Sequence, residues 1–263
     1  MCKSWVWRWR WTKIFLMVFY CCFVFAKVSQ AGSLPETLQK IKPSIVGVGT
    51  FMPSRSPRGV FLGTGFVVGN GKLVVTNAHV VAQLLNYEKM EQWAIFISNG
   101  NNPKMAIVER IGLDTEHDVA ILKLKKGVLP SLKLGETAGV REGEQYAFTG
   151  YPIGMVLGLY PVTHQGIVSA ISPVAIPTFD STKLNAKLIR RLQKPYNVFQ
   201  LDATAYPGNS GSPLYNADTG EVIGVINKVF VKESKENVLS NPSGITYAIP
   251  IEHVKNLLKS KGL

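Results

Sequence analysis

The chain has 263 residues, of which 46% are hydrophobic and 17% are charged, and its formal net charge is +12. This length is enough for a proper buried core, in one large β domain or two small ones. All three cysteines lie in residues 1–31. The rest of the chain therefore cannot form a disulfide, a cysteine-based metal site or a cysteine nucleophile.

Residues 1–31 have the pattern of a targeting sequence. A basic, tryptophan-rich stretch over Lys3–Lys13 precedes the uncharged apolar run Ile14–Ala26, and small residues stand at Ser29 and Ala31. This order predicts a signal peptide that is cut after Ala31, and hence export to the periplasm or the medium. The apolar run is short for a membrane span of ~20 residues, which favours cleavage, and an uncleaved membrane anchor is the alternative.

A short helix is predicted directly after the leader, over Ser33–Lys42. Ser33 can cap its first turn, with Glu36 three residues further on. A final helix is predicted over 251–260, because Val254, Leu257 and Leu258 recur at helical spacing.

Between the two helices the chain consists of short runs rich in Val, Ile and aromatic residues, separated by Gly, Pro and Asn. Such runs at regular spacing are typical of a β-sandwich or β-barrel. The predicted strands are Ile45–Thr50, Gly59–Val68, Lys72–Thr76, Trp93–Ser98, Met105–Ile111, Val119–Leu124, Tyr146–Thr149, Val162–Ile171, Val198–Leu201, Val222–Val231 and Ile245–Ile249.

Three motifs carry the candidate chemistry. Ser210 lies in Pro-Gly-Asn-Ser-Gly-Ser-Pro-Leu, His79 follows an apolar run in Val-Val-Thr-Asn-Ala-His-Val, and Asp118 begins the run Asp-Val-Ala-Ile-Leu-Lys-Leu. A serine hydroxyl needs a neighbouring base to act as a nucleophile, and the base needs an orienting carboxylate. The order His79, Asp118, Ser210 is the order that chymotrypsin-like folds use for this purpose.

These motifs resemble those of the HtrA (Deg) family of trypsin-like serine proteases. The approach strand Gly63–Val68 and the late strand Gly244–Pro250 extend the resemblance over most of the chain after the leader. The resemblance implies an all-β fold of two antiparallel six-stranded barrels, barrel one over about 43–128 and barrel two over about 129–250, in a protease domain spanning 32–263. The active site would lie between the barrels.

The resemblance assigns Ser210 as nucleophile, His79 as general base and then acid, and Asp118 as the carboxylate that orients the imidazole. Backbone N–H groups of the turn at Gly208, Asn209 and Ser210 would form the oxyanion hole, chiefly those of Gly208 and Ser210. Asp114 and Asp202 are alternative acids by position. Asp118 is preferred because it begins the family's own acid strand, whereas Asp114 suits a turn.

The substrate pocket is predicted to be walled by two short segments: Thr204, Ala205, Tyr206, Val225, Ile226 and Asn227. Trypsin has an aspartate six residues before its nucleophile, but this chain has Thr204 there. Cleavage after Lys or Arg is therefore not expected, and a small or medium aliphatic residue is. Ser212 replaces the family's usual second glycine, as it does in glutamyl endopeptidases, but those use a histidine where this chain has Asn227. Asn227 in place of that histidine makes specificity for Glu less favoured.

His117, His164 and His253 are interpreted as structural, and His117 is expected to face away from Asp118 on a strand. No spacing of His, Asp and Glu suggests a metal site, and no phosphate-binding loop motif occurs, so neither a metal, a cofactor nor ATP is expected. The chain ends where the family usually continues into a PDZ domain, which is therefore expected to be absent.

Residues 173–196 form a basic insertion, read either as a solvated loop or as a docking site for an anionic partner or a neighbouring subunit. The resemblance implies a homotrimer built by the segment 34–44. The favoured function is an ATP-independent exported endopeptidase acting on unfolded or misfolded proteins. The alternatives are a protease-fold chaperone or binding scaffold with gated or lost activity, and a cationic protein that binds nucleic acid or membranes, which the sequence disfavours.

Overall fold

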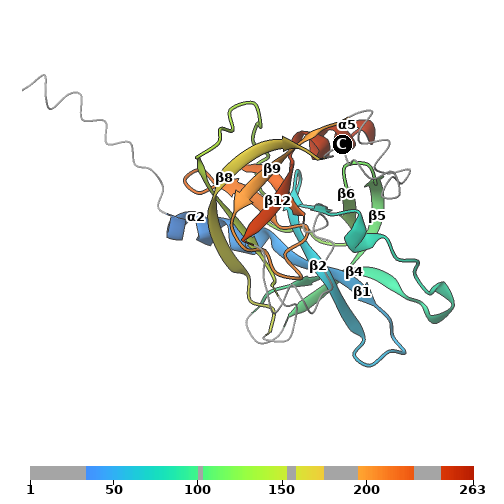
Figure 1. Ribbon diagram of the computed structural model, residues 1–263. Helices are drawn as coiled ribbons and strands as arrows, with labels where there is room; N and C mark the ends of the chain where they lie inside the picture. Colours follow the sequence, from blue (N-terminus) through green and yellow to red (C-terminus); the bar gives the residue numbers. More distant parts are fainter. Residues whose placement is uncertain (1–33, 100–102, 153–157, 175–194, 228–243) are drawn as a thin grey trace, which may run out of the picture. The chain divides into compact units, whose positions relative to one another are not determined.

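The computed structural model describes residues 34–99, 103–152, 158–174, 195–227 and 244–263. Three predicted segments lie outside these residues: the leader, most of the basic insertion, and residues 228–231 of one strand. The described strands form two closed six-stranded antiparallel barrels, and two short α-helices flank them (Figure 1). The predicted fold class is therefore confirmed.

Barrel one has the strand order β1-β2-β3-β6-β5-β4, in which β1 closes the ring by pairing with β4. Its strands are rich in β-branched and aromatic residues, which suit a pleated and buried surface. Their bounds are β1 Ile45–Phe51, β2 Gly59–Val68, β3 Leu73–Thr76, β4 Gln92–Ile97, β5 Lys104–Asp114 and β6 Val119–Leu124.

Barrel two has the order β10-β11-β12-β9-β8-β7, and β10 closes the ring by pairing with β7. Its bounds are β7 Gln145–Gly150, β8 Val162–Pro173, β9 Asn197–Asp202, β10 Pro213–Asn216, β11 Val222–Asn227 and β12 Ile245–Pro250. The strand β10 was not predicted from the sequence. This strand has four residues, begins with a proline and follows a Gly-Ser turn, so it carries almost no alternating pattern.

The two helices hold the ends of the described chain against different barrels. In α2 (Leu34–Ile41), the Thr37 hydroxyl donates to the Asp218 carbonyl at 3.2 Å, at the turn after β10. The helix α5 (Glu252–Ser260) follows the last strand of barrel two but packs against β5 and β6 of barrel one. Its buried Val254 and Leu257 join a hydrophobic cluster drawn from both barrels. No helix among the described residues is long and apolar enough to cross a membrane.

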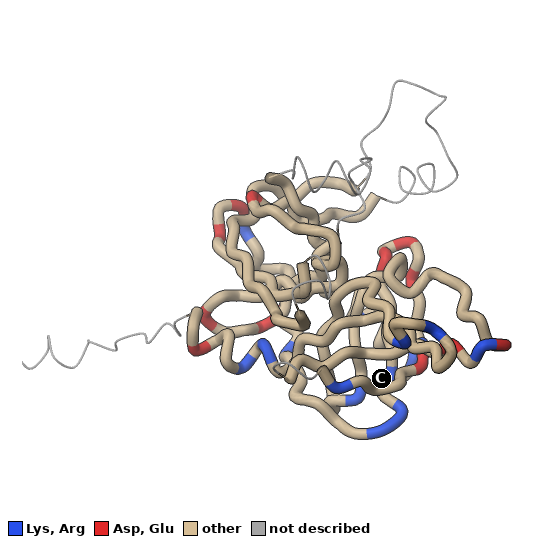
Figure 2. The backbone as a smooth tube through the Cα atoms, turned by 90° about the horizontal axis from the view of Figure 1, so that it is seen from below, with Lys and Arg blue, Asp and Glu red and all other residues tan. Residues whose placement is uncertain are grey.

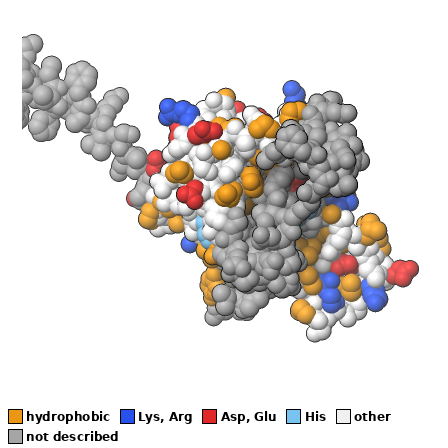
Figure 3. All heavy atoms as spheres, viewed as in Figure 1, with side chains coloured by type: hydrophobic (Ala, Val, Ile, Leu, Met, Phe, Trp, Pro, Cys, Tyr) orange, Lys and Arg blue, Asp and Glu red, His pale blue; other side chains and the backbone are white. Residues whose placement is uncertain are grey.

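Charged residues of both signs lie along the described backbone (Figure 2). The face seen in Figure 3 likewise mixes apolar, polar and charged side chains. Buried ionisable groups are few by comparison, and Glu91 and Asp118 are the buried acidic residues of the described chain. Each of them has specific donors, as a carboxylate removed from water requires.

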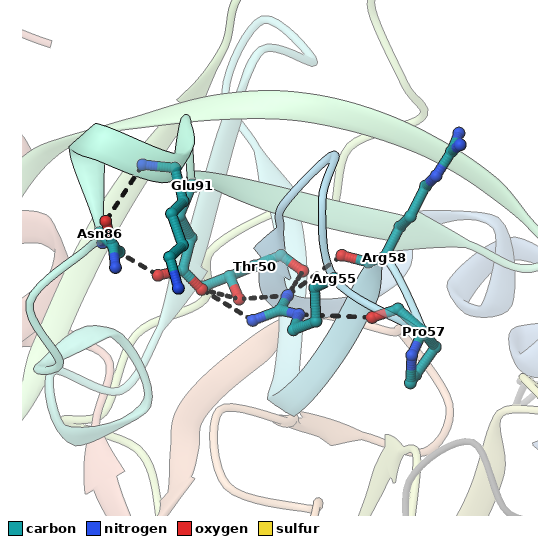
Figure 4. A network of polar contacts seen from close by, with 7 residues as sticks. Thr50, Arg55, Pro57, Arg58, Asn86 and Glu91 are labelled. Carbon is teal, nitrogen blue, oxygen red and sulfur yellow. Dashed lines mark hydrogen bonds and ion pairs between the residues drawn. The ribbon is translucent and has the colours of Figure 1, made fainter.

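A network around Glu91 ties the β1–β2 hairpin to the loop that follows His79 (Figure 4). One oxygen of Glu91 accepts from the Thr50 hydroxyl at 2.8 Å and from the Arg55 guanidinium at 2.9 Å. The other oxygen accepts from the Asn86 backbone N–H at 3.0 Å. Burial by itself would raise the pKa of Glu91, but the bonds from Asn86, Thr50 and Arg55 outweigh it and hold the pKa below its ordinary value.

Replacing Glu91 by Gln is expected to lower the free energy of unfolding by about 1–3 kcal/mol at pH 7, because Arg55 and Asn86 lose a charged acceptor. In the wild type this contribution is complete above the unfolded pKa of a glutamate and is lost as the pH falls through the lower folded pKa. Urea unfolding at pH 7 and pH 3 measures both effects.

The matched control is Glu221→Gln, which removes an exposed ion pair with Lys133. An exposed pair contributes little, so this change should leave the unfolding midpoint unaltered. Equal midpoints for the two variants would contradict the importance of the Glu91 network.

Candidate functional site

His79 and Asp118 meet because the strands next to them are neighbours in barrel one. His79 begins the 3-10 turn His79–Val81 just after β3, Asp118 directly precedes β6, and β3 pairs with β6. The two residues make a double contact. Nδ1 of His79 lies 2.7 Å from Oδ2 of Asp118, and the backbone N–H of His79 donates to Oδ1 at 2.8 Å.

Asp118 has a backbone conformation that few residues other than glycine adopt, with φ of 56°. Aspartate is among the residues that tolerate this left-handed region. The Asp118 carbonyl accepts from the Ala78 backbone N–H at 3.1 Å and from the Asn77 side-chain amide at 3.0 Å. The residues immediately before His79 thus hold the main chain of Asp118 while His79 itself holds its carboxylate.

A third donor reaches Asp118 from barrel two. The side-chain amide of Asn227, at the end of β11, donates to Oδ2 of Asp118 at 2.8 Å, and Asn227 is 1% exposed. From the sequence, Asn227 was expected in the wall of the substrate pocket. A contact with an acid 109 positions earlier in the chain left no signal in the sequence.

Ser210 lies on a tight turn between the end of β9 and the start of β10. Gly208 and Gly211 both have positive φ, 100° and 88°. A side chain at position 211 would also come within 2.0 Å of the Thr64 carbonyl oxygen. Only glycine fits these two places without strain.

The turn leaves two backbone donors without acceptors among the described residues, the N–H groups of Gly208 and Ser210. The N–H of Asn209, between them, donates instead to the Tyr206 carbonyl at 3.0 Å. Of the three positions predicted for an oxyanion hole, the N–H groups of Gly208 and Ser210 are therefore the two that remain available to an anion.

Gly63 marks where Ser210 approaches the segment that carries His79. A Cβ on Gly63 would lie 2.8 Å from the side chain of Val80, the residue after His79, and 3.1 Å from the Ser210 carbonyl oxygen. No hydrogen bond joins the Ser210 hydroxyl to His79 within the described part of the chain. Such bonds are often long without substrate and tighten when it binds.

The residues predicted to wall a substrate pocket lie in two different environments. Thr204 and Tyr206 are partly exposed and Ala205 is buried. The side chains of Val225 and Ile226 are fully buried in hydrophobic clusters. Neither of these two side chains is therefore exposed to a substrate, and the Ile226 backbone is already bonded to Gly211 and Ser212.

Comparison with known proteins shows which family has this architecture. Residues 63–225 match the family model described as "Trypsin-like peptidase domain". The chain belongs to the trypsin-like peptidase family.

Several HtrA-type proteases are similar to the chain. It is 34% identical over 191 residues to "Probable periplasmic serine endoprotease DegP-like" of Halomonas elongata, an alignment that covers 73% of this chain and 33% of that protein. It is 31% identical over 229 residues to "Serine protease HTRA4" of Homo sapiens, covering 86% and 40%. The chain thus spans well under half the length of these relatives.

Among solved structures, "HtrA-type protease AlgW with tripeptide" is similar at a TM-score of 0.62 and 25% identity. That alignment covers 87% of this chain and 63% of the other. The resemblance to HtrA-like proteases inferred from the motifs is confirmed. The expected absence of a PDZ domain stays a prediction.

Asp202 and Asp114, the alternative acids, have other surroundings. Asp202 is exposed at the end of β9. Asp114 caps the turn between β5 and β6: its Oδ1 accepts from the backbone N–H groups of Glu116 and His117, and its Oδ2 lies 2.7 Å from Nδ1 of His117. The prediction that Asp114 serves a turn agrees with these contacts.

His117 lies in this turn, so the expectation that it would face away from Asp118 on a strand was wrong. Its ring stacks on that of His253 of α5, with centroids 3.9 Å apart, and both rings contact Tyr196 edge-on. Burial, and to a smaller extent His117, lower the pKa of His253 to about 4, against the opposing effect of Asp114 and Glu252. His253 is therefore neutral in the folded protein at pH 7.

The stability of the protein is expected to fall as the pH drops from 6.5, the ordinary pKa of His253, to about 4, its folded pKa. In that pH range His253 is protonated in the unfolded chain and neutral in the folded protein, so protonation favours unfolding. His253→Phe keeps a stacking ring and removes the titration, so its unfolding midpoint in urea should depend less on pH than that of the wild type.

Part of the pH dependence should remain in this variant, because burial also lowers the pKa of His164. Asn256→Ala, at an exposed position of the same helix, should retain the wild-type slope. A His253→Phe slope equal to that of Asn256→Ala would contradict the assignment.

The described residues contain no group of three or more His, Cys, Asp or Glu side chains able to hold a metal.

Proposed function

We propose that the protein is an exported serine endopeptidase that hydrolyses peptide bonds of unfolded or misfolded proteins without ATP. Ser210 is the nucleophile, His79 the general base and then acid, and Asp118 the orienting carboxylate. The family membership and the names of the HtrA-type relatives support the class of reaction, and the word "periplasmic" in one of those names supports export. The leader, a homotrimer built on 34–44, and an aliphatic preference in the pocket belong to the same proposal.

The observation that carries this proposal is the contact of 2.7 Å between Nδ1 of His79 and Oδ2 of Asp118. A carboxylate on Nδ1 fixes the tautomer in which Nε2 accepts a proton, and it stabilises the imidazolium that then forms. The His79 side chain is 35% exposed, whereas that of Asp118 is 7% exposed. The base can therefore reach a substrate, while water scarcely reaches the acid.

The chain's own groups account for each step of acyl transfer. His79 takes the Ser210 proton as Oγ attacks the peptide carbonyl carbon, and the carbonyl oxygen becomes an oxyanion facing the N–H groups of Gly208 and Ser210. His79 then gives the proton to the leaving amine, which leaves an ester on Ser210. Water attacks this ester with the same proton transfers, releasing the carboxylic acid and restoring the Ser210 hydroxyl.

The first test is casein degradation and fluorophosphonate labelling by residues 32–263, beside Ser210→Ala and Ser212→Ala. Both signals should disappear in Ser210→Ala, because the nucleophilic oxygen is gone. They should persist in Ser212→Ala, whose hydroxyl is buried without an acceptor or donor among the described residues. A wild-type protein that neither cleaves nor labels would argue for the binding-scaffold alternative.

Asp118→Asn tests the acid. It should lower kcat by about 10⁴-fold, since an amide favours the wrong tautomer of His79. Asp114→Asn is the matched control, because it changes the same chemical group on the same turn and contacts a different histidine. Measurement of kcat on a peptide substrate decides between them, and a larger loss in Asp114→Asn would reverse the assignment.

A further inference from the structure

We propose that Thr64 is a positioning residue for the oxyanion hole, which extends the proposed function and rests on it. Thr64 lies on β2 of barrel one and is 0% exposed. It contacts the turn that carries Ser210, which belongs to barrel two. The sequence alone suggested no role for it.

All three polar groups of Thr64 are engaged. Its backbone N–H donates to the Ser210 carbonyl at 2.9 Å, and its hydroxyl donates to the Gly208 carbonyl at 2.7 Å. The hydroxyl also accepts from the Tyr151 backbone N–H at 3.0 Å, and the Thr64 carbonyl accepts from the Thr76 hydroxyl at 2.7 Å. Because the hydroxyl both donates and accepts, its rotation about the Cβ–Oγ bond is fixed.

The first consequence concerns the peptide plane between Gly208 and Asn209. Thr64 holds its carbonyl oxygen at 2.7 Å, and the Tyr206 carbonyl accepts from its N–H at 3.0 Å. A peptide group is planar, so a plane held at both edges cannot flip without breaking both bonds. At Gly208 this restraint matters most, since glycine alone has the freedom to turn such a plane over.

The second consequence concerns the plane between Ser210 and Gly211. Thr64 N–H holds its carbonyl oxygen, and the Ile226 carbonyl accepts from its N–H at 2.9 Å. The plane between Asn209 and Ser210, which carries the free N–H of Ser210, is therefore bracketed by two planes that are each held at both edges.

Thr64 thus fixes the carbonyl groups of the two residues whose N–H groups are free to bind an oxyanion. Donors that are aimed before the reaction need no reorganisation as charge develops, which is the source of their catalytic effect. The hydroxyl of Thr64 acts through the Gly208 carbonyl and touches no substrate in this scheme. Its loss should consequently reduce transition-state stabilisation and leave substrate binding largely intact.

Thr64→Val removes the hydroxyl and keeps the shape. We expect kcat on a peptide substrate to fall by about 10- to 100-fold, less than the ~10²–10³-fold cost of losing an oxyanion-hole donor outright, with KM changed by less than about threefold. A peptide aldehyde forms an oxyanion on Ser210, and its affinity should fall by the same factor as kcat. Thr64→Ser restores the hydroxyl and should restore most of both quantities.

Thr50→Val is the matched control, because Thr50 is also a fully buried threonine of barrel one whose hydroxyl donates a 2.8 Å bond, to Glu91. Its kcat, KM and aldehyde affinity should stay at wild-type values, whatever the change in unfolding midpoint. If Thr64→Val does not fold, Thr64→Cys replaces it. A thiol is a weak donor, so kcat should rank wild type, Ser, Cys in descending order.

The outcomes separate this proposal from the proposed function. An active wild type in which Thr64→Val matches Thr50→Val, or in which Thr64→Ser is as impaired as Thr64→Val, overturns the role of Thr64 alone. A rise in KM with unchanged kcat also overturns it. A folded wild type that neither cleaves nor labels overturns both.

Discussion

The site depends on a seam of buried hydrogen bonds between β2 of barrel one and the turn at 208–212 of barrel two. Thr64 donates to two carbonyls across this seam, and Tyr151 of barrel two donates back to Thr64. Glycine at position 211 permits the approach, since any Cβ there would collide with the Thr64 backbone. Buried backbone polar groups need hydrogen-bond partners, so a shift of the turn relative to β2 would leave some of these groups unpaired.

The acid is fixed from both barrels by the same principle. Within barrel one, Asn77 and Ala78 hold the Asp118 main chain and His79 holds its carboxylate. From barrel two, Asn227 adds a donor to Oδ2. A buried carboxylate needs such donors in place of the water it has lost. Here they also determine which oxygen faces the imidazole.

Much of the fold could be predicted because each long strand has its own pattern. The runs that become β2 and β6 were predicted with their observed bounds, as both are rich in apolar residues. The strand β10 was missed, because its position follows from closing barrel two and not from its four residues. His117 was misplaced for a related reason, since the turn that holds it is made by Asp114 side-chain bonds that no periodicity reveals.

In the candidate site, too, the residues in local motifs could be predicted and those that act over long sequence distances could not. The motifs around His79, Asp118 and Ser210 were visible because each is local, and the chemistry of the three residue types suggested how they combine. Thr64 and Asn227 were not, since each acts on residues more than a hundred positions away. A threonine in an apolar strand and an asparagine at a strand end look like ordinary members of a β-barrel until the second barrel is in place.

The helix α5 shows why the barrels form a functional unit. It leaves barrel two at Pro250, packs on β5 and β6 of barrel one, and places His253 against His117, the residue before Asp118. The turn that carries the acid is thus supported by the C-terminal helix through His117 and by Asn227 through the Asp118 carboxylate. Neither barrel alone contains the groups that orient Asp118 or those that hold the Ser210 turn. The geometry of the site is therefore a property of the packing between barrels, and a change that loosens this packing alters the acid and the nucleophile turn together.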